Sequence, residues 1–139
     1  MLKIVEDLAV CRPTMFPTVP RLFNKIYAKI KDQFSEKNFV LRTLIERGLA
    51  AKIQNLHDSG TTTHALYDRL VFNKVKAILG GRVRIMVTGS APIAQDVLDF
   101  LKVCFCCPIT EGYGMTESGG GSCITYPDDT HSGHVGGPL

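Results

Sequence analysis

The stretch Val83-Arg84-Ile85-Met86-Val87-Thr88-Gly89-Ser90-Ala91-Pro92 decides the fold of this chain. Residues Val83 to Val87 are mostly apolar and β-branched, which is typical of a strand that is buried on most of its surface. The glycine and the proline that follow break the strand. Apolar residues then recur at helical spacing as far as Phe105, and Pro108-Ile109-Thr110 opens a second short strand. This order predicts a β-α-β unit with parallel strands and a right-handed crossover.

Four helices are predicted before this unit, because apolar residues recur every three to four positions in each of them. Pro13 ends the first helix, since the residue before a proline is pushed out of the helical conformation. We therefore expect an α/β fold in which helices flank a partial parallel sheet. The predicted helices are Leu2 to Val10, Arg21 to Ser35 with Pro20 as the first residue, Phe39 to about Leu56, and about Ala65 to Leu79 before Gly80-Gly81; Thr14 to Val19 is predicted to be extended.

The composition is that of an ordinary globular domain. Of the 139 residues, 45% are hydrophobic and 21% are charged, which argues against a disordered or collagen-like chain. No apolar run approaches the roughly 18 residues that a membrane-spanning helix needs. Glu6 and Asp7 lie where a signal peptide has its apolar centre, so the sequence does not signal secretion. The net charge of +3 is too small to indicate a nucleic-acid partner by itself.

The cysteines and histidines lack the spacing of a disulfide framework, a zinc site or a catalytic triad. Five cysteines, an odd number without paired spacing, favour a reducing compartment. No histidine lies within Cys104-Phe105-Cys106-Cys107, so core packing is the favoured role for these cysteines. The histidines, predicted in loops or at element ends, are His57, His64, His131 and His134. The Gly-His-Val-Gly context of His134 favours a role in shaping that turn.

Two unusual loops follow the predicted strands. Gly89 to Pro92 follows the first strand of the β-α-β unit, and Gly112 to Glu117 follows the second. Ligands of open parallel sheets bind outside the carboxyl ends of the strands, so both loops should face one crevice. A tyrosine can stack on a purine, glycines let the backbone approach a ligand, a threonine can bond a phosphate, and a glutamate can hold Mg²⁺. On residue types alone, such a loop is more often an ordinary turn.

The complete string Glu111-Gly112-Tyr113-Gly114-Met115-Thr116-Glu117 resembles the adenine and Mg²⁺ motif of the adenylate-forming, or AMP-binding, enzymes. Thr88 to Pro92 resembles the Gly-x-Ala-Pro loop that precedes this motif in the superfamily. Further segments are similar to its long-chain fatty acyl-CoA synthetase branch, the long-chain-fatty-acid–CoA ligases. These segments are Pro13-Thr14, Val19-Pro20-Arg21-Leu22, Gly80-Gly81-Arg82-Val83-Arg84 and Gly133-His134-Val135-Gly136.

The resemblance implies an ATP-dependent acid–thiol ligase. A fatty carboxylate attacks the α-phosphate of ATP to give an acyl-adenylate, and the thiol of coenzyme A then displaces AMP. By the same resemblance, Tyr113 stacks on adenine, with Glu111 and Gly112 beside the base, and Gly114 is also expected to bind the nucleotide. Thr116 bonds the α-phosphate and Glu117 binds Mg²⁺, which makes these two residues the expected catalytic ones. The backbone of Gly89, Ser90 and Ala91 is expected to line adenine and the carboxylate end of the acyl site.

The resemblance also implies what residues 1–139 do not contain. The phosphate loop, the ribose-binding aspartate and the lysine-bearing C-terminal lid domain are expected elsewhere in the ligase. Ser59-Gly60-Thr61-Thr62-Thr63 is interpreted as an interhelical loop, because no buried strand precedes it and no Pro-Lys-Gly follows it. We therefore interpret residues 1–139 as an internal part of one AMP-binding domain, and we expect no ligase activity from this segment alone.

Two alternatives remain at this stage. The chain could be a non-catalytic nucleotide-binding or scaffold protein derived from the same fold, or another acid–thiol ligase of the superfamily. Nucleic-acid binding is disfavoured, because no exposed aromatic residues are interleaved with the basic row Arg21, Lys25, Lys29 and Lys31. The resemblance implies an intracellular ligase at the cytosolic face of the endoplasmic reticulum, mitochondrion or peroxisome, with any membrane anchor outside this segment. Acyl chain length, organelle and oligomeric state stay open.

Overall fold

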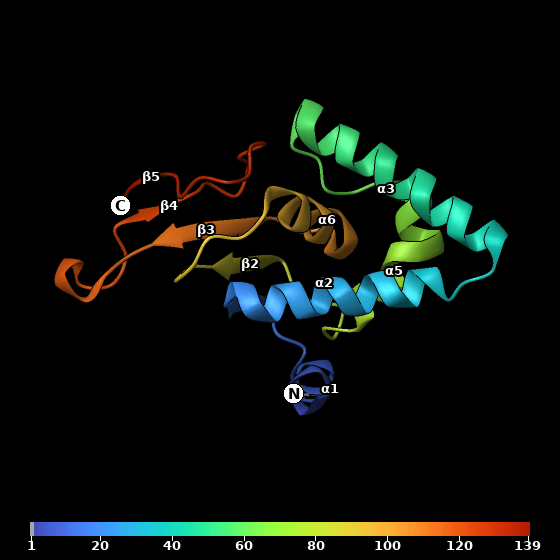
Figure 1. The fold of residues 1–139 in the computed structure, drawn as a ribbon, viewed down its shortest axis with the longest axis horizontal. Coiled ribbons are helices and arrows are strands. Elements are labelled where there is room, and N and C mark those ends of the chain that lie inside the picture. The colour runs from blue at the N-terminus through green and yellow to red at the C-terminus, as the bar shows by residue number, and fades with distance from the viewer. Residues whose placement is uncertain (1) are drawn as a thin grey trace.

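The computed structural model describes residues 2–139, with side chains described from Asp7 onward, and it shows an α/β fold (Figure 1). One sheet has the strand order β1-β2-β3-β4-β5. Strands β1, β2 and β3 are parallel, and β4 and β5 continue the sheet antiparallel. The strands are β1 (Met15–Thr18), β2 (Ile85–Thr88), β3 (Ile109–Tyr113), β4 (Cys123–Ile124) and β5 (Gly137–Pro138).

The β-α-β unit predicted from the sequence is present. Helix α6 (Gln95–Phe105) connects β2 to β3, and the two strands are parallel as expected. The segment between β1 and β2 contains α2 (Pro20–Ser35), α3 (Phe39–Ser59), α4 (Ala65–Tyr67), the π-helix η1 (Asp68–Phe72) and α5 (Asn73–Ala77). Helix α1 (Leu2–Cys11) precedes β1. The α/β prediction with flanking helices is thus confirmed.

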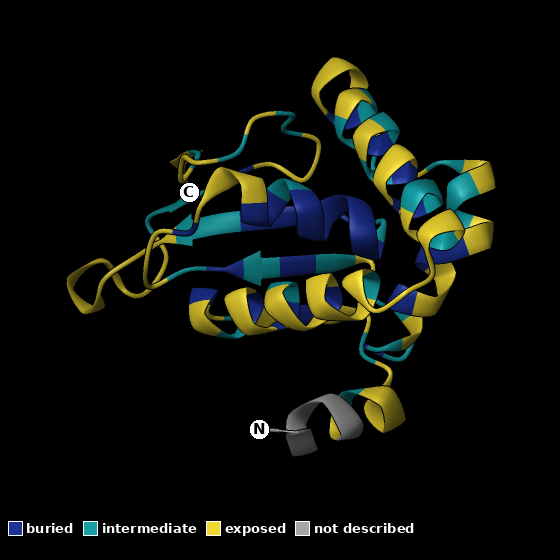
Figure 2. Cartoon of the chain, turned by 45° about the vertical axis from the view of Figure 1, so that its right-hand side comes forward, coloured by how far each residue is buried: buried dark blue, intermediate teal, exposed yellow. Residues whose placement is uncertain are grey.

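The main core lies on one face of the three parallel strands. The strand register aligns Phe16, Met86 and Ile109, and all three side chains are buried. They belong to the same apolar cluster as Phe23 and Leu98, which come from α2 and α6. Figure 2 shows buried positions on these helices and strands. Side chains alternate across a strand, so the neighbouring residues point to the other face. An open groove runs along that face. The residues that line it include Pro17, which is exposed, and Val87, which is half-buried.

Several predicted boundaries need correction. Strand β2 begins at Ile85 and ends at Thr88, rather than spanning Val83 to Val87. Helix α6 begins only at Gln95, after Ala94 in extended conformation, although Pro92 was expected near its start. Helix α3 continues three residues beyond Leu56 to Ser59, where Gly60 ends it with a φ of 69°. A left-handed residue at this place is a common helix terminator, and glycine adopts it without a Cβ penalty.

The helix predicted for Ala65 to Leu79 is a composite of three pieces. The central piece, the π-helix η1, lies against Lys52 of α3. The Asp68 carboxylate pairs with the Lys52 ammonium group. This ammonium group also lies 4.3 Å from the centre of the Phe72 ring. Lys52 is fully buried, although the sequence pattern predicted only apolar residues on that side of α3. A buried ammonium requires close partners, and the π-turn presents two of them to the same atom.

The cysteine prediction holds for the residues of the core. Cys104 and Cys107 are buried and all five cysteines are free. Burial raises the pKa of Cys104, and it raises the pKa of Cys107 to about 12. Both are therefore inert thiols that act as small apolar side chains. Within residues 2–139, no helix is both long enough and apolar enough to cross a bilayer.

Candidate functional site

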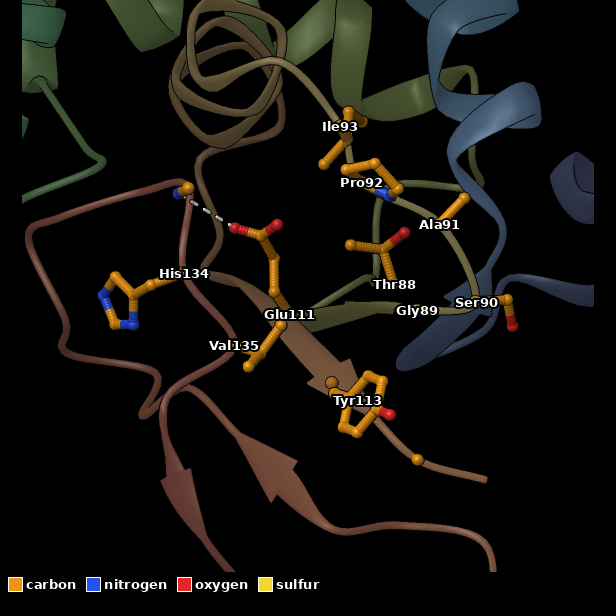
Figure 3. Close-up of a pocket in the computed structure, with 13 residues that line it drawn as sticks. Thr88, Gly89, Ser90, Ala91, Pro92, Ile93, Glu111, Tyr113, His134 and Val135 are labelled. Carbon is orange, nitrogen blue, oxygen red and sulfur yellow. Dashed lines mark hydrogen bonds between the residues drawn. The ribbon is translucent and has the colours of Figure 1, made fainter. Parts of the chain in front are cut away.

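A cavity of about 350 Å³ opens where β2 and β3 end (Figure 3). This is the edge of the sheet at which parallel strands present their carboxyl ends. The cavity has three walls from separate parts of the chain. They are the segment Thr88 to Ile93 after β2, the segment Glu111 to Gly114 at the end of β3, and the segment Gly133 to Val135 before β5.

The first wall depends on an unusual backbone. Gly89 packs so closely against β3 that a Cβ atom there would lie 2.9 Å from the carbonyl oxygen of Gly112. A side chain at this position would therefore push the two walls apart. Ser90 follows with a φ of 71°, a left-handed conformation that non-glycine residues rarely adopt. The turn directs Ala91 and Pro92 along the rim of the cavity (Figure 3).

The second wall carries the aromatic ring and the carboxylate expected at the site. Tyr113 ends β3 and lines the cavity with 47% of its surface exposed, so a ligand can reach the side chain. Glu111 lies deeper, and its Oε1 accepts a hydrogen bond from the backbone N–H of Gly133 at 3.1 Å (Figure 3). The N–H of Glu111 donates to Thr125 Oγ1 at 2.8 Å, which fixes this residue from a second side.

The structure divides the predicted site residues into two groups. Around one cavity it brings together Gly89, Ser90, Ala91, Glu111, Gly112, Tyr113 and Gly114. Thr116 and Glu117 do not line that cavity. They lie on the exposed 3₁₀ turn η2 (Thr116–Ser118), which folds back so tightly that a Cβ on Gly114 would lie within bonding range of Gly120.

Sequence reasoning did not place the third wall in the site. His134 and Val135 line the cavity opposite the other two segments (Figure 3). The expected turn-shaping role of His134 is confirmed, because its Nδ1 accepts a hydrogen bond from the N–H of Gly136 at 3.1 Å. Its Nε2 lies 3.1 Å from Asp129 Oδ2. The resemblance of Gly133-His134-Val135-Gly136 to the family could have indicated this wall. The segment lies about 20 residues after β3, however, and local patterns do not predict a contact over that separation.

Thr88 is a second residue that the sequence analysis left out of the site. It is 2% exposed at the end of β2, and its hydroxyl group has no hydrogen-bond partner among the described residues. Buried hydroxyl groups in proteins are normally bonded. The strand register places Thr88 beside Glu111, and both residues line the cavity where the first two walls meet.

Solved structures agree with the α/β fold around this cavity. The chain superposes on the adenylation domain of a carboxylate reductase from Mycobacterium chelonae with a TM-score of 0.60. The sequences are 21% identical, and the match covers 87% of this chain and 16% of that one. At this identity the likeness concerns the fold alone, which is that of an adenylation domain.

The sequence comparisons are more specific. A model of the family "AMP-binding enzyme" matches residues 2–139, so the chain belongs to the AMP-binding enzyme family. It is 46% identical over 139 residues to the peroxisomal long chain acyl-CoA synthetase 7 of Arabidopsis thaliana. It is 44% identical over 137 residues to the long-chain-fatty-acid–CoA ligase 1 of Homo sapiens. Each match covers 98% of this chain and 19% of the relative, so the chain spans about a fifth of their length.

Proposed function

We propose that this chain forms the base-binding part of the nucleotide site in an ATP-dependent long-chain fatty acid–CoA ligase. One observation carries the proposal: the two segments that the resemblance assigns to adenine, Gly89 to Ala91 and Glu111 to Gly114, line a single cavity. They are separated in the chain by the whole of α6. The family match supports AMP or ATP as the ligand, and the relatives named as long-chain ligases support a fatty acid and coenzyme A as the co-substrates.

In this proposal the described residues bind and orient rather than act as nucleophiles. The Tyr113 ring stacks on adenine, and the backbone of Gly89, Ser90 and Ala91 lies along the base and the carboxylate of the fatty acid. Thr116 bonds the α-phosphate. The adenylation step forms a bond between a fatty-acid carboxylate oxygen and the α-phosphorus, and it releases pyrophosphate. Charge that develops on the phosphate then needs fixed donors and a metal ion.

Glu117 is the residue proposed to hold Mg²⁺. In the described part of the chain, no group of three or more His, Cys, Asp or Glu side chains could hold a metal ion. A single exposed carboxylate fits Mg²⁺ nonetheless, because this ion commonly binds through one or two carboxylates together with substrate phosphates and water. When bound with ATP, the ion would neutralise charge on the phosphates.

A scaffold without catalytic function is not favoured, because the relatives that match this chain are named as synthetases and ligases. Two Arabidopsis relatives are named as peroxisomal. We accordingly propose an intracellular ligase associated with an organelle.

The proposed nucleotide site is tested by calorimetric titration of the chain with AMP. We expect binding of AMP that weakens about tenfold in Tyr113→Ala, because stacking a base on an aromatic ring contributes about 1–3 kcal/mol. Tyr126→Ala is the matched control, since Tyr126 is 72% exposed and does not line the cavity. Equal affinities of wild type and Tyr113→Ala would contradict the assignment of the base site.

A further inference from the structure

Ser132, in the loop before β5, is held by three side chains of α6. Gln95 Nε2 donates to the carbonyl oxygen of Ser132 at 2.6 Å. Lys102 Nζ donates to Ser132 Oγ at 2.9 Å, and this hydroxyl in turn donates to Asp99 Oδ1 at 2.7 Å. Gln95, Asp99 and Lys102 are four and three residues apart, so they share one face of the helix. That face is therefore polar and bound to a single residue of a distant loop.

The next residue, Gly133, is held from the other side. Its N–H donates to Glu111 Oε1 at 3.1 Å, and its φ is 91°. A Cβ atom at this position would lie 2.2 Å from Gln95 Nε2. The backbone conformation therefore favours glycine, and a side chain here would displace the Gln95 amide from Ser132. We call this set of contacts the Ser132 clasp; its members are Gln95, Asp99, Lys102, Glu111, Ser132 and Gly133.

The clasp includes the ionisable side chains of Lys102, Asp99 and Glu111, although apolar side chains could also have packed the loop against α6. Lys102 is only 5% exposed, and burial lowers the pKa of its ammonium group, while Asp99 and Glu111 oppose this shift. Asp99 Oδ2 also lies 2.8 Å from His57 Nε2 at the end of α3. Apolar residues of similar volume often stabilise a fold as well as a buried ion pair does. A directional polar network, in contrast, permits only one position of the loop.

That position matters because the clasp is adjacent to the cavity. Gly133 of the clasp begins the third wall, and the next two residues, His134 and Val135, complete it (Figure 3). Glu111 belongs to the second wall and to the clasp at the same time. A shift of Ser132 and Gly133 would therefore move the third wall relative to Tyr113 and change the width of the cavity.

We propose that the Ser132 clasp positions the His134–Val135 wall for the bound nucleotide, so that Gln95, Asp99, Lys102 and Ser132 are positioning residues of the base site. The proposal rests on the proposed function, since it takes the ligand of the cavity to be an adenine nucleotide. None of the four α6 and loop side chains needs to touch the base. They act through the backbone of Gly133, His134 and Val135, which do line the cavity.

The test compares Ser132→Ala with wild type by AMP titration and by NMR at a temperature where both are folded. Removing the hydroxyl breaks the bonds to Lys102 and Asp99, so we expect AMP affinity to fall about three- to tenfold. We also expect the Gly133 amide proton to shift and to exchange with solvent at least fivefold faster. Lys102→Met should have the same two effects, and Ser132→Thr, which keeps a hydroxyl, should restore both values.

Ser35→Ala is the matched control, because Ser35 Oγ is also a hydrogen-bond donor, but to the carbonyl oxygen of Asp32 at the end of α2. It should change neither AMP affinity nor the Gly133 amide. A fall in the thermal midpoint of Ser132→Ala without a change in AMP affinity would overturn the positioning role. Unchanged exchange of Gly133 would overturn the clasp itself. If the wild-type chain bound no AMP, both the proposed function and the positioning role would fail. If wild type and Ser132→Ala bound AMP with equal affinity, only the positioning role would fail.

Discussion

The cavity wall at Gly133 to Val135 and the turn at Met115 to Gly121 differ in how they are held. Side chains from α6 and β3 bind the wall at Ser132 and Gly133. The turn is bonded largely within itself: Ser118 and Gly120 donate backbone N–H groups to the carbonyl oxygen of Met115, and Ser122 Oγ donates to Ser118 Oγ. The wall is thus fixed by the core of the domain, and the turn is fixed by its own residues.

This difference separates the two chemical tasks of the site. The residues proposed for the base lie around a formed cavity that is attached to the sheet and to α6. Thr116 and Glu117, proposed for the phosphate and the metal ion, lie on the exposed turn. Segments with few tertiary contacts open most easily, so the turn is the part of the site that we expect to adjust when phosphates bind.

The largest expected effect concerns the whole reaction. The 139-residue chain should show no fatty-acid-dependent ATP–pyrophosphate exchange, because Thr116 and Glu117 on the exposed turn are the only phosphate and metal ligands that we propose within the described residues. A graft of residues 2–139 in place of the matching segment of the human long-chain-fatty-acid–CoA ligase 1 should restore exchange. Exchange by the chain alone would show that the turn already forms a complete phosphate site. A folded but inactive graft would contradict the proposed function.

Substituting one glycine in each region tests the difference in attachment. Gly133→Ala adds a Cβ against Gln95 to a residue with positive φ, whereas the Cβ of Gly119→Ala meets no atom within 4 Å at a φ of 74°. The backbone strain costs about 1–2 kcal/mol in both, and displacing the Gln95 amide from Ser132 costs about 0.5–1.5 kcal/mol more only at Gly133. Urea denaturation should therefore show a clearly larger loss of unfolding free energy for Gly133→Ala. Equal losses would mean that the wall is no more firmly packed than the turn.

The metal ion provides a smaller and more selective effect. Glu117→Ala should weaken the binding of ATP in the presence of Mg²⁺ a few-fold and leave the binding of AMP unchanged, because AMP needs no bridging metal ion. Glu36→Ala, at the end of α2, is a control with the same loss of charge. Titrations with each nucleotide, with and without Mg²⁺, measure the effect. A loss of AMP affinity in Glu117→Ala would contradict the metal role and would indicate that Glu117 contacts the AMP part of the nucleotide.

The smallest expected effect is a pH dependence of the clasp. Burial lowers the folded-state pKa of Lys102, so the unfolded state binds more protons between that value and the ordinary pKa of 10.5. Stability conferred by this position therefore rises with pH in that window. The difference in unfolding free energy between wild type and Lys102→Met should shift in favour of wild type as the pH approaches 10.5. A shift in favour of Lys102→Met would contradict the assigned direction.

Much of the architecture follows from local patterns. Apolar spacing and proline positions predicted α2 at Pro20–Ser35, with Pro20 as its first residue, and the β-α-β unit around α6. The order of motifs also predicted that the loops after β2 and β3 would meet. These predictions succeed because they depend on backbone sterics and on the alternation of side chains within short segments.

Other features depend on partners that are distant in sequence. Lys52 lies on a side of α3 that the pattern predicted to be apolar, and its burial follows only from Asp68, Phe72 and Cys106 being in reach. The composite helix from Ala65 to Ala77 has the same origin. Periodicity does not show such pairs, because each partner has an ordinary local sequence.

The amino-acid sequence by itself determined the family and the residues proposed to hold the base, the phosphate and the metal ion, because these follow from two short motifs, Thr88 to Pro92 and Glu111 to Glu117. The tertiary structure decided which of them share a cavity, and it added a wall from Gly133 to Val135. The physical reason is that a loop becomes part of a site only where distant side chains bond to it. Here those bonds come from α6 and Glu111, some 20 to 40 residues earlier in the chain.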